Sequence, residues 1–122
     1  MTGIVIEAGG HRLWSCAGDG PVLDLERVVT DIIGEAFAAN VRIVAIPLAR
    51  LPANFLDLRA RLAGEVLQKF VNYGLRVAIV GDVSQAAATS TALLDFIRES
   101  NRGRHVWFVP DLEALSTRLA RS

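Results

Sequence analysis

The stretch RIVAIP, residues 42–47, decides the fold of this chain. Its centre, Ile43–Ile46, is apolar without interruption, whereas a strand with one face in water alternates apolar and polar residues. Such a run predicts a strand that is covered on both faces, as in the middle of a parallel sheet. Leu75–Val80 and His105–Val109 have the same character further along the chain. Together these segments predict the parallel strands of an α/β domain.

Residues at helical spacing fill the gaps between these strands. Apolar residues recur with a helical period over 25–37, with Asp24 as a suitable N-cap and Asn40 able to close the helix. We expect a second, long helix over Phe55–Tyr73, closed by Gly74 in the left-handed conformation. Each segment therefore supplies the crossover that a parallel pair of strands requires.

The C-terminal third predicts two more helices. Either Ser84 or Ser90 can cap the first of them, which ends near residues 101–103. Asp111 is the expected N-cap of the last helix, whose inward residues are Leu112, Leu115 and Leu119. With these helices, strands and helices alternate to the end of the chain.

The N-terminal segment predicts a hairpin. Residues 3–8 and 11–16 are strands joined by Gly9-Gly10, a pair suited to a tight turn with positive φ. The predicted fold is therefore an α/β single domain over residues 1–122. It has a five-stranded mixed, mainly parallel sheet, an N-terminal hairpin and about four helices.

The composition excludes several classes of protein. Among 122 residues, 52% are apolar and the formal net charge is zero, which does not fit a disordered chain or one that binds nucleic acid through bulk charge. The run Ile4–Ile6 is broken by Glu7 and has no basic leader, and no apolar run is long enough to span a membrane. We therefore expect a cytoplasmic protein with neither a nucleic-acid nor a membrane partner.

No complete catalytic, metal or phosphate-binding motif is present. The single Cys16 excludes an internal disulfide framework, and His11 and His105 lie far apart without a third partner. Neither Gly-rich phosphate motif occurs. Arg98, Arg102, Arg104 and His105 form the one basic cluster, which is interpreted as a solvated helix end. We expect no catalytic residues, metal or cofactor, and the sequence favours a protein that is not an enzyme.

Two surfaces remain as candidates for function. The first is the outward line of the predicted 55–73 helix, with Asp57, Arg61, Gly64, Glu65, Gln68, Lys69 and Asn72. It is interpreted as a surface for a protein partner or for self-association, or else as a solvated face that pairs with itself. The alternative is a small-molecule or nucleotide site at the carboxyl ends of the parallel strands, near Pro47, with Arg50, Gly81 and Asp82.

Two glycines lie inside the helical patterns. Gly34 and Gly64 should each cost ~1 kcal/mol relative to alanine. A close approach of another backbone is the reason we consider for each, within the domain or from another subunit.

Three segments carry a resemblance to a known family. The chain resembles the bacterial domain-of-unknown-function family 4180 over residues 54–73, over RVAIVGD at 76–82, and over FIRESNRG at 96–103 with VWFV at 106–109, and LAGEVLQKFVNY at 62–73 is the specific part. The similarity covers nearly the whole chain. This family carries no established activity, so the resemblance implies no catalytic residue.

The order of elements is similar to that of the sulfate-transporter and anti-sigma-factor-antagonist (STAS) domains. This likeness implies a non-enzymatic regulatory domain that binds a protein partner. In those domains a serine at the start of the helix after the third strand is often phosphorylated. The matching segment here, residues 52–57, has neither Ser nor Thr, so the phosphoserine switch does not carry over.

Overall fold

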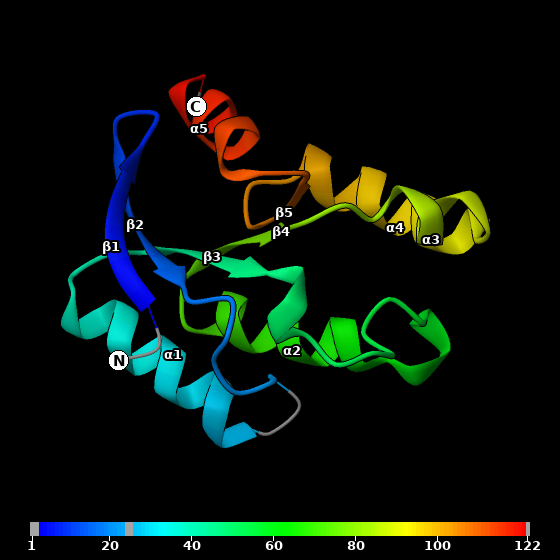
Figure 1. The fold of residues 1–122 in the computed structure, drawn as a ribbon, viewed down its shortest axis with the longest axis horizontal. Coiled ribbons are helices and arrows are strands. Elements are labelled where there is room, and N and C mark those ends of the chain that lie inside the picture. The colour runs from blue at the N-terminus through cyan, green and yellow to red at the C-terminus, as the bar shows by residue number, and fades with distance from the viewer. Residues whose placement is uncertain (1–2, 24–25, 122) are drawn as a thin grey trace.

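The structure, a computed structural model, describes residues 3–23 and 26–121, except for the side chain of Ala60. Within these residues the chain forms a five-stranded sheet and five α-helices (Figure 1). The strands are β1 (Gly3–Ala8), β2 (His11–Cys16), β3 (Ile43–Pro47), β4 (Arg76–Val80) and β5 (Val106–Val109). The helices are α1 (Glu26–Ala38), α2 (Leu62–Asn72), α3 (Ser84–Ala88), α4 (Thr91–Arg102) and α5 (Leu112–Ala120).

The strands lie in the sheet in the order in which they occur in the chain. β1 and β2 pair antiparallel, and every later neighbour pairs parallel, which confirms the predicted mixed, mainly parallel sheet. The hairpin turn has φ values of 57° at Gly9 and 83° at Gly10, as a two-residue turn between twisted strands requires. All four residues of Ile43–Ile46 are buried, as expected for a strand in the centre of the sheet.

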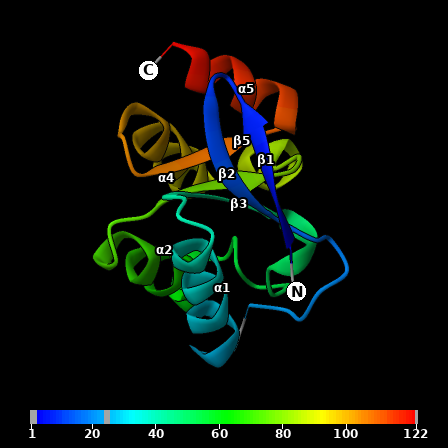
Figure 2. The ribbon, with the colours of Figure 1, turned by 90° about the vertical axis from the view of Figure 1, so that its left-hand side faces the viewer.

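The sheet is the middle of three layers. α1 and α2 cover one face and α5 covers the other, as Figures 1 and 2 show from two directions. The larger core cluster joins α1 and α2 to the sheet and includes Leu93 and Ile97 of α4. A smaller cluster on the opposite face joins the hairpin and β3–β5 to Leu115 and Leu119 of α5. The sheet is therefore buried on both faces, which explains the continuous apolar strands.

The predicted 55–73 helix is too long at its start, because α2 begins only at Leu62. The Asp57 carboxylate accepts a hydrogen bond from the Arg59 backbone N–H and caps a short 3₁₀ turn over Leu58–Ala60. Arg61 then has a φ of 59°, in the left-handed region, which interrupts the helical path. Phe55 is buried in the core from a turn rather than from a helix.

The other helix boundaries agree with their signals. Ser90 caps α4 by accepting from the Leu93 N–H, whereas Ser84 is the first residue of α3 and does not cap it, so there is one more helix than expected. Asp111 caps α5 as predicted, but Leu112 is 41% exposed and does not face inward. The expected cap at Asp24 lies outside the described residues, as does Leu25.

Candidate functional site

Five of the predicted partner-surface residues lie together on the outer side of α2. They form what we call the α2 face: Gly64, Glu65, Gln68, Lys69 and Asn72. Asp57 and Arg61 were expected on the same helix, but both precede it. Asp57 forms an ion pair with Arg59 at 3.2 Å. The sequence pattern therefore identified the part of the surface that is helical and missed the break before it.

Two hollows on the surface are lined in part by residues of the α2 face. The first has a volume of about 260 Å³ and lies between the starts of α1 and α2, with apolar walls that include Val29 and Val66. The second is wider, with about 610 Å³, and is lined by the five α2-face residues together with Tyr73. Lys69 borders both hollows and forms an ion pair with Glu26 of α1 at 2.6 Å.

The polar groups of the α2 face are arranged by neighbours on the same helix or on α1. The hydrogen bond and positive charge of Lys69 lower the pKa of the exposed Glu26 carboxyl. The Gln68 side-chain amide donates to the Asn72 Oδ1 at 2.7 Å, one helical turn along. Glu65 is exposed and forms no ion pair within the described residues. The face therefore presents both donors and acceptors rather than one sign of charge.

An exposed aromatic pair lies at the end of this face. The rings of Phe37 and Tyr73 meet edge to face with centroids 6.5 Å apart, and their residues are 37% and 52% exposed. The guanidinium of Arg42 covers Phe37, with its Cζ 4.4 Å from the ring centroid. Helical periodicity assigned both rings to the core, which is wrong, because each stands in the last turn or just beyond the end of its helix. The only sequence signal for the pair was two large apolar residues, Phe37 and Tyr73, at the ends of the predicted helices.

Neither helical glycine is explained by packing within the domain. A Cβ built on Gly64 or on Gly34 meets no atom within 4 Å, and both residues are exposed. A glycine in the middle of a helix lowers stability by ~1 kcal/mol relative to alanine. Gly64 lies in the wall of the wider hollow, where the missing side chain leaves the helix backbone accessible.

The residues predicted for a ligand site at the carboxyl ends of the strands have structural contacts. Arg50 is fully buried, and its Nε and Nη1 donate to the carbonyl oxygens of Pro21 and Ala17 at 2.7 and 2.8 Å. A Cβ on Gly81 would lie 2.6 Å from the Cβ of Leu48. Arg50 therefore holds the loop that follows β2, and Gly81 makes room for a neighbouring side chain.

Asp82 is exposed and organises the start of α3. Its carboxylate accepts hydrogen bonds from the hydroxyl and backbone N–H of Ser84 at 2.6 and 2.9 Å, and these bonds lower the pKa of Asp82. Asp82 was predicted to contact a ligand. In the structure its carboxylate instead accepts both hydrogen bonds from Ser84.

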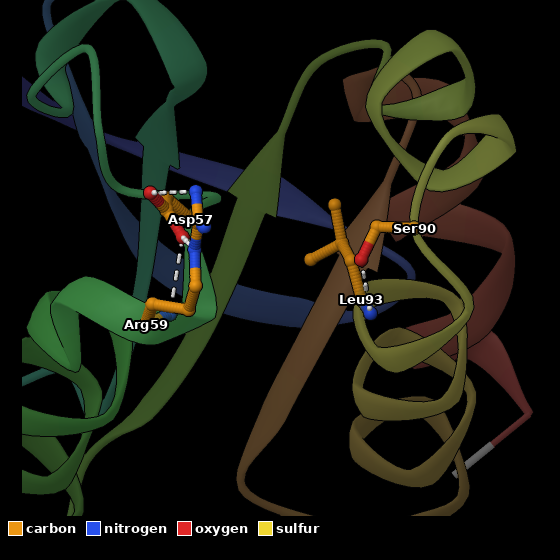
Figure 3. A network of polar contacts seen from close by, with 4 residues as sticks. All are labelled: Asp57, Arg59, Ser90 and Leu93. Atoms are coloured by element: carbon orange, nitrogen blue, oxygen red, sulfur yellow. Dashed lines mark hydrogen bonds and ion pairs between the residues drawn. The ribbon is translucent and has the colours of Figure 1, made fainter.

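A hollow of about 490 Å³ does lie on this side of the sheet, between residues 56–59 and the segment from α3 to the start of α4. Figure 3 shows its two polar pairs, Asp57 with Arg59 on one side and Ser90 with the Leu93 N–H on the other. The Arg59 side chain and backbone N–H lower the pKa of the exposed Asp57 carboxyl. Each polar group drawn there already has a partner on its own segment.

The remaining reactive side chains do not form a site. Burial raises the pKa of the Cys16 thiol to about 12, which leaves the sulfur protonated and unreactive at neutral pH. His11 begins β2 and His105 directly precedes β5, so β3 and β4 lie between them. Over residues 3–23 and 26–121, no three His, Cys, Asp or Glu side chains are grouped as metal ligands. No helix of that part of the chain is both long and apolar enough to cross a membrane.

Comparison with known proteins gives a family and nothing beyond it. Neither the curated proteins nor the solved structures contain a match to this chain. The family model described as "Domain of unknown function (DUF4180)" matches residues 8–119, which span four of the five helices and four of the five strands completely and α5 up to Leu119. Because this match covers most of the sequence, the chain belongs to the DUF4180 family.

Proposed function

We propose that this chain is a non-enzymatic regulatory domain that acts through protein contacts, and that its α2 face binds a second copy of the chain. The observation that carries the proposal is Gly64, an exposed glycine in the middle of α2 whose Cβ position is open. Its ~1 kcal/mol cost to the helix is not repaid by any contact inside the domain. A helix backbone from another subunit, packed against this position, would supply the missing contact.

The chemistry of the face favours a second copy as the partner. A two-fold contact places the same patch on both sides, so the patch must complement itself. Arg61 and Glu65 carry opposite charges at its start, and neither forms an ion pair within the described residues. The amides of Gln68 and Asn72 each hold a donor and an acceptor. The exposed rings of Phe37 and Tyr73 add the apolar anchor that protein interfaces commonly contain.

The test is the oligomeric state of a charge-altered α2 face. We expect the wild-type chain to form a dimer in sedimentation equilibrium, and the double variant Glu65→Arg with Gln68→Glu to be monomeric. At protein concentrations too low for association, the melting temperature should be nearly unchanged, because exposed substitutions usually alter stability by within about ±0.5 kcal/mol.

A matched control carries the same substitutions on other helices. Glu113→Arg with Gln85→Glu changes two exposed residues of α5 and α3, and it should leave the dimer intact. A wild-type chain that stays monomeric at all concentrations contradicts the proposal. So does a double variant that associates as strongly as the control.

A small-molecule or nucleotide site at the carboxyl ends of the strands is the second candidate. The hollow of about 490 Å³ next to Asp57 and Ser90 supports it, because this volume is in the range of small-ligand pockets. The test is a thermal-shift screen with nucleotides and common metabolites. A reproducible stabilisation that Asp82→Ala or Asp57→Asn removes would favour this function over the first.

A further inference from the structure

The edge of the sheet that β5 forms is closed by a side chain. The Gly81 N–H donates to the Val109 carbonyl at 2.9 Å, so Val109 faces β4 and its neighbour Phe108 points its backbone groups away from β4. The Asn101 side chain of α4 accepts a hydrogen bond from the Phe108 N–H at 2.7 Å. A side chain bound to a strand in this way occupies the position that a further strand would take.

The opposite edge, which β1 forms, is open. In the part of the chain that the structure describes, the backbone of β1 pairs only with β2. The two-residue turn makes Ala8 and His11 a hydrogen-bonded pair, and such pairs alternate along an antiparallel ladder. Val5 and Glu7 lie between the bonded residues, so their N–H and C=O groups point outward. Figure 2 looks toward this edge, and no helix lies in front of β1.

β1 also lacks the features that commonly protect an exposed edge. Its sequence, GIVIEA, contains no Lys, Arg or Pro, and its six residues pair with β2 in an unbroken register without a bulge. Three of the six are the β-branched residues Ile and Val, which favour extended backbone. The strand is therefore suited to pairing along its free edge.

The two faces of β1 differ in the side chains that they offer. Ile6 packs against the smaller core cluster on the α5 side of the sheet, and Ile4, on the same face, is 62% exposed. On the other face Val5 packs against the larger cluster and Glu7 is exposed. An added strand would thus meet apolar side chains on one face and a carboxylate on the other.

Glu7 indicates the charge of the added strand. It lies opposite Arg12 in the hairpin register, yet no ion pair joins the two within the described residues. Opposite charges on directly opposed residues of neighbouring strands stabilise the pairing. β1 itself has no basic residue, so a second copy of β1 paired at this edge cannot place one opposite Glu7. A strand from another protein can.

We propose that the free edge of β1 binds an extended peptide segment of another protein as an added antiparallel strand. Val5 and Glu7 each donate and accept one backbone hydrogen bond with the segment. Apolar residues of the segment lie opposite Ile4 and Ile6, where they extend the smaller core, and a Lys or Arg lies opposite Glu7. This surface is separate from the α2 face, because α2 covers a face of the sheet and β1 forms its edge.

The test is a titration of the full chain with the acetylated and amidated hexapeptide Thr-Lys-Val-Thr-Val-Thr. In the proposed register its lysine lies opposite Glu7 and its valines lie opposite Ile6 and Ile4. We expect saturable ¹H–¹⁵N NMR shifts in β1 and slower hydrogen exchange of the Val5 and Glu7 amides. The Ile4 and Ile6 amides already bond to β2, so their exchange should change little.

Two methylated peptides provide a matched pair. Methylation of the backbone nitrogen of the central threonine, opposite Val5, removes a donor that faces β1 and should raise the Kd by about tenfold or more. Methylation of the following valine, opposite Ile4, alters a nitrogen that points away from β1. Its Kd should stay within about twofold of that of the unmodified peptide.

A charge exchange tests the contact with Glu7. Glu7→Lys should raise the Kd of the hexapeptide by about two- to fivefold, since it replaces an attraction by a repulsion. A peptide with glutamate in place of its lysine should bind Glu7→Lys more tightly than it binds the wild type. Asp95→Lys makes the same charge change on an exposed position of α4 and should leave the Kd within about twofold of wild type.

Four outcomes would overturn the proposal. These are the absence of saturable binding, an equal loss of affinity for both methylated peptides, and an equal effect of Glu7→Lys and Asp95→Lys. The fourth is slower exchange of the Val5 and Glu7 amides with rising protein concentration and no peptide, which would assign the edge to a second copy. The variant Glu65→Arg with Gln68→Glu should bind the hexapeptide with the Kd of the wild type, so this result is independent of the α2-face dimer.

Discussion

At the scale of the single residue, Arg50 shows how a charged side chain can belong to the core. Its guanidinium has no solvent exposure and donates to the carbonyls of Pro21 and Ala17, while its own carbonyl accepts from the Leu23 N–H at 2.8 Å. A Cβ on Gly20 would lie 2.5 Å from its Cζ, so the loop fits closely around the side chain. Arg50 thus fixes the loop of residues 17–23 that follows β2.

We expect Arg50→Met to lower the free energy of unfolding by about 3 kcal/mol or more. The substitution keeps a long side chain but leaves the buried position without the guanidinium that donates to the carbonyls of Pro21 and Ala17, so these partly buried groups lose a donor. Urea denaturation measures the change. Arg98→Met, an exposed substitution on α4, is the control and should change stability by within about 0.5 kcal/mol. A similar small effect for Arg50→Met would show that the loop finds other donors.

Cys16 is a built-in reporter of folding, because it is the single cysteine of the chain. Burial raises the pKa of its thiol from 9.0 to about 12, although the positive charge of Arg50 lowers it. Since the thiolate is the reactive form, we expect a thiol reagent at pH 8 to label Cys16 only after unfolding. The labelling rate should rise with urea in step with the unfolded fraction. Rapid labelling of the native protein is the contrary result.

The same raised pKa makes stability depend on pH in a defined window. Above pH 9 the unfolded thiol loses its proton while the folded thiol keeps it up to about pH 12. The unfolded state then binds fewer protons, so stability falls as the pH rises through this window, by at most ~1.4 kcal/mol per pH unit. The urea midpoint of the wild type should therefore fall between pH 8 and pH 10, and the midpoint of Cys16→Ala should fall by less over the same range. An equal decline in both proteins would remove Cys16 as the cause.

At the scale of the element, the turn of the first hairpin is tied to the last helix. Gly9 donates its N–H to the Ser116 hydroxyl of α5 at 3.0 Å, and a Cβ on Gly9 would lie well within contact distance of the Ser116 carbonyl and the Ala120 nitrogen. The adjacent Gly10 has nothing within 4 Å of its Cβ position. Two neighbouring glycines with positive φ therefore have different reasons for being glycine.

These two positions give a matched pair of substitutions. Gly10→Ala should cost only the left-handed backbone strain, ~1 kcal/mol, whereas Gly9→Ala should cost more because α5 must also move away. Thermal unfolding of both variants measures the difference. Equal losses of stability would show that α5 moves away from the turn at no cost.

The elements that the sequence predicted well are those with one dominant local signal. The continuous apolar run of β3 and the Gly9-Gly10 turn each have a single structural solution, and both were predicted with the right bounds within one residue. The start of α2 was not, because Phe55 lies at helical spacing from later core residues while being buried from a turn. Spacing alone does not distinguish these cases, since Asp57 caps a separate 3₁₀ turn and the left-handed Arg61 interrupts the helical path before α2, and neither feature is periodic.

The candidate surfaces also differ in how far the sequence could predict them. The α2-face residues from Gly64 to Asn72 could be read from periodicity, because a helix places them on one side. The hollow between residues 56–59 and the segment from α3 to the start of α4 could not, because segments far apart in the sequence line it and only the folded chain brings them together. Arg50 was selected as a ligand contact because it follows a strand, and its burial appears only once the loop of residues 17–23 folds over it.

At the scale of the whole molecule, Gly64 links monomer stability to association. Gly64→Ala should raise the free energy of unfolding of the monomer by ~1 kcal/mol, because helix propensity improves and the Cβ meets no atom. Under the proposed contact it should also weaken the dimer. Gly34→Ala offers a comparison on α1, with the same gain in stability and no effect on association. Denaturation and sedimentation of both variants separate the two effects, and a dimer unaffected by Gly64→Ala would move the contact away from this helix.

The contact between the first hairpin and the last helix also orders the folding of the chain during its synthesis. Each strand pairs with its predecessor in the sequence, so the sheet can grow in the order in which the ribosome delivers it. The smaller core cluster cannot form in this order, because Ala8 and Leu13 of the hairpin pack with Leu115 and Leu119 of α5, which is made much later. A nascent chain that lacks α5 therefore exposes an apolar sheet face until α5 has been made. α5 then covers the face of the sheet to which the first hairpin contributes.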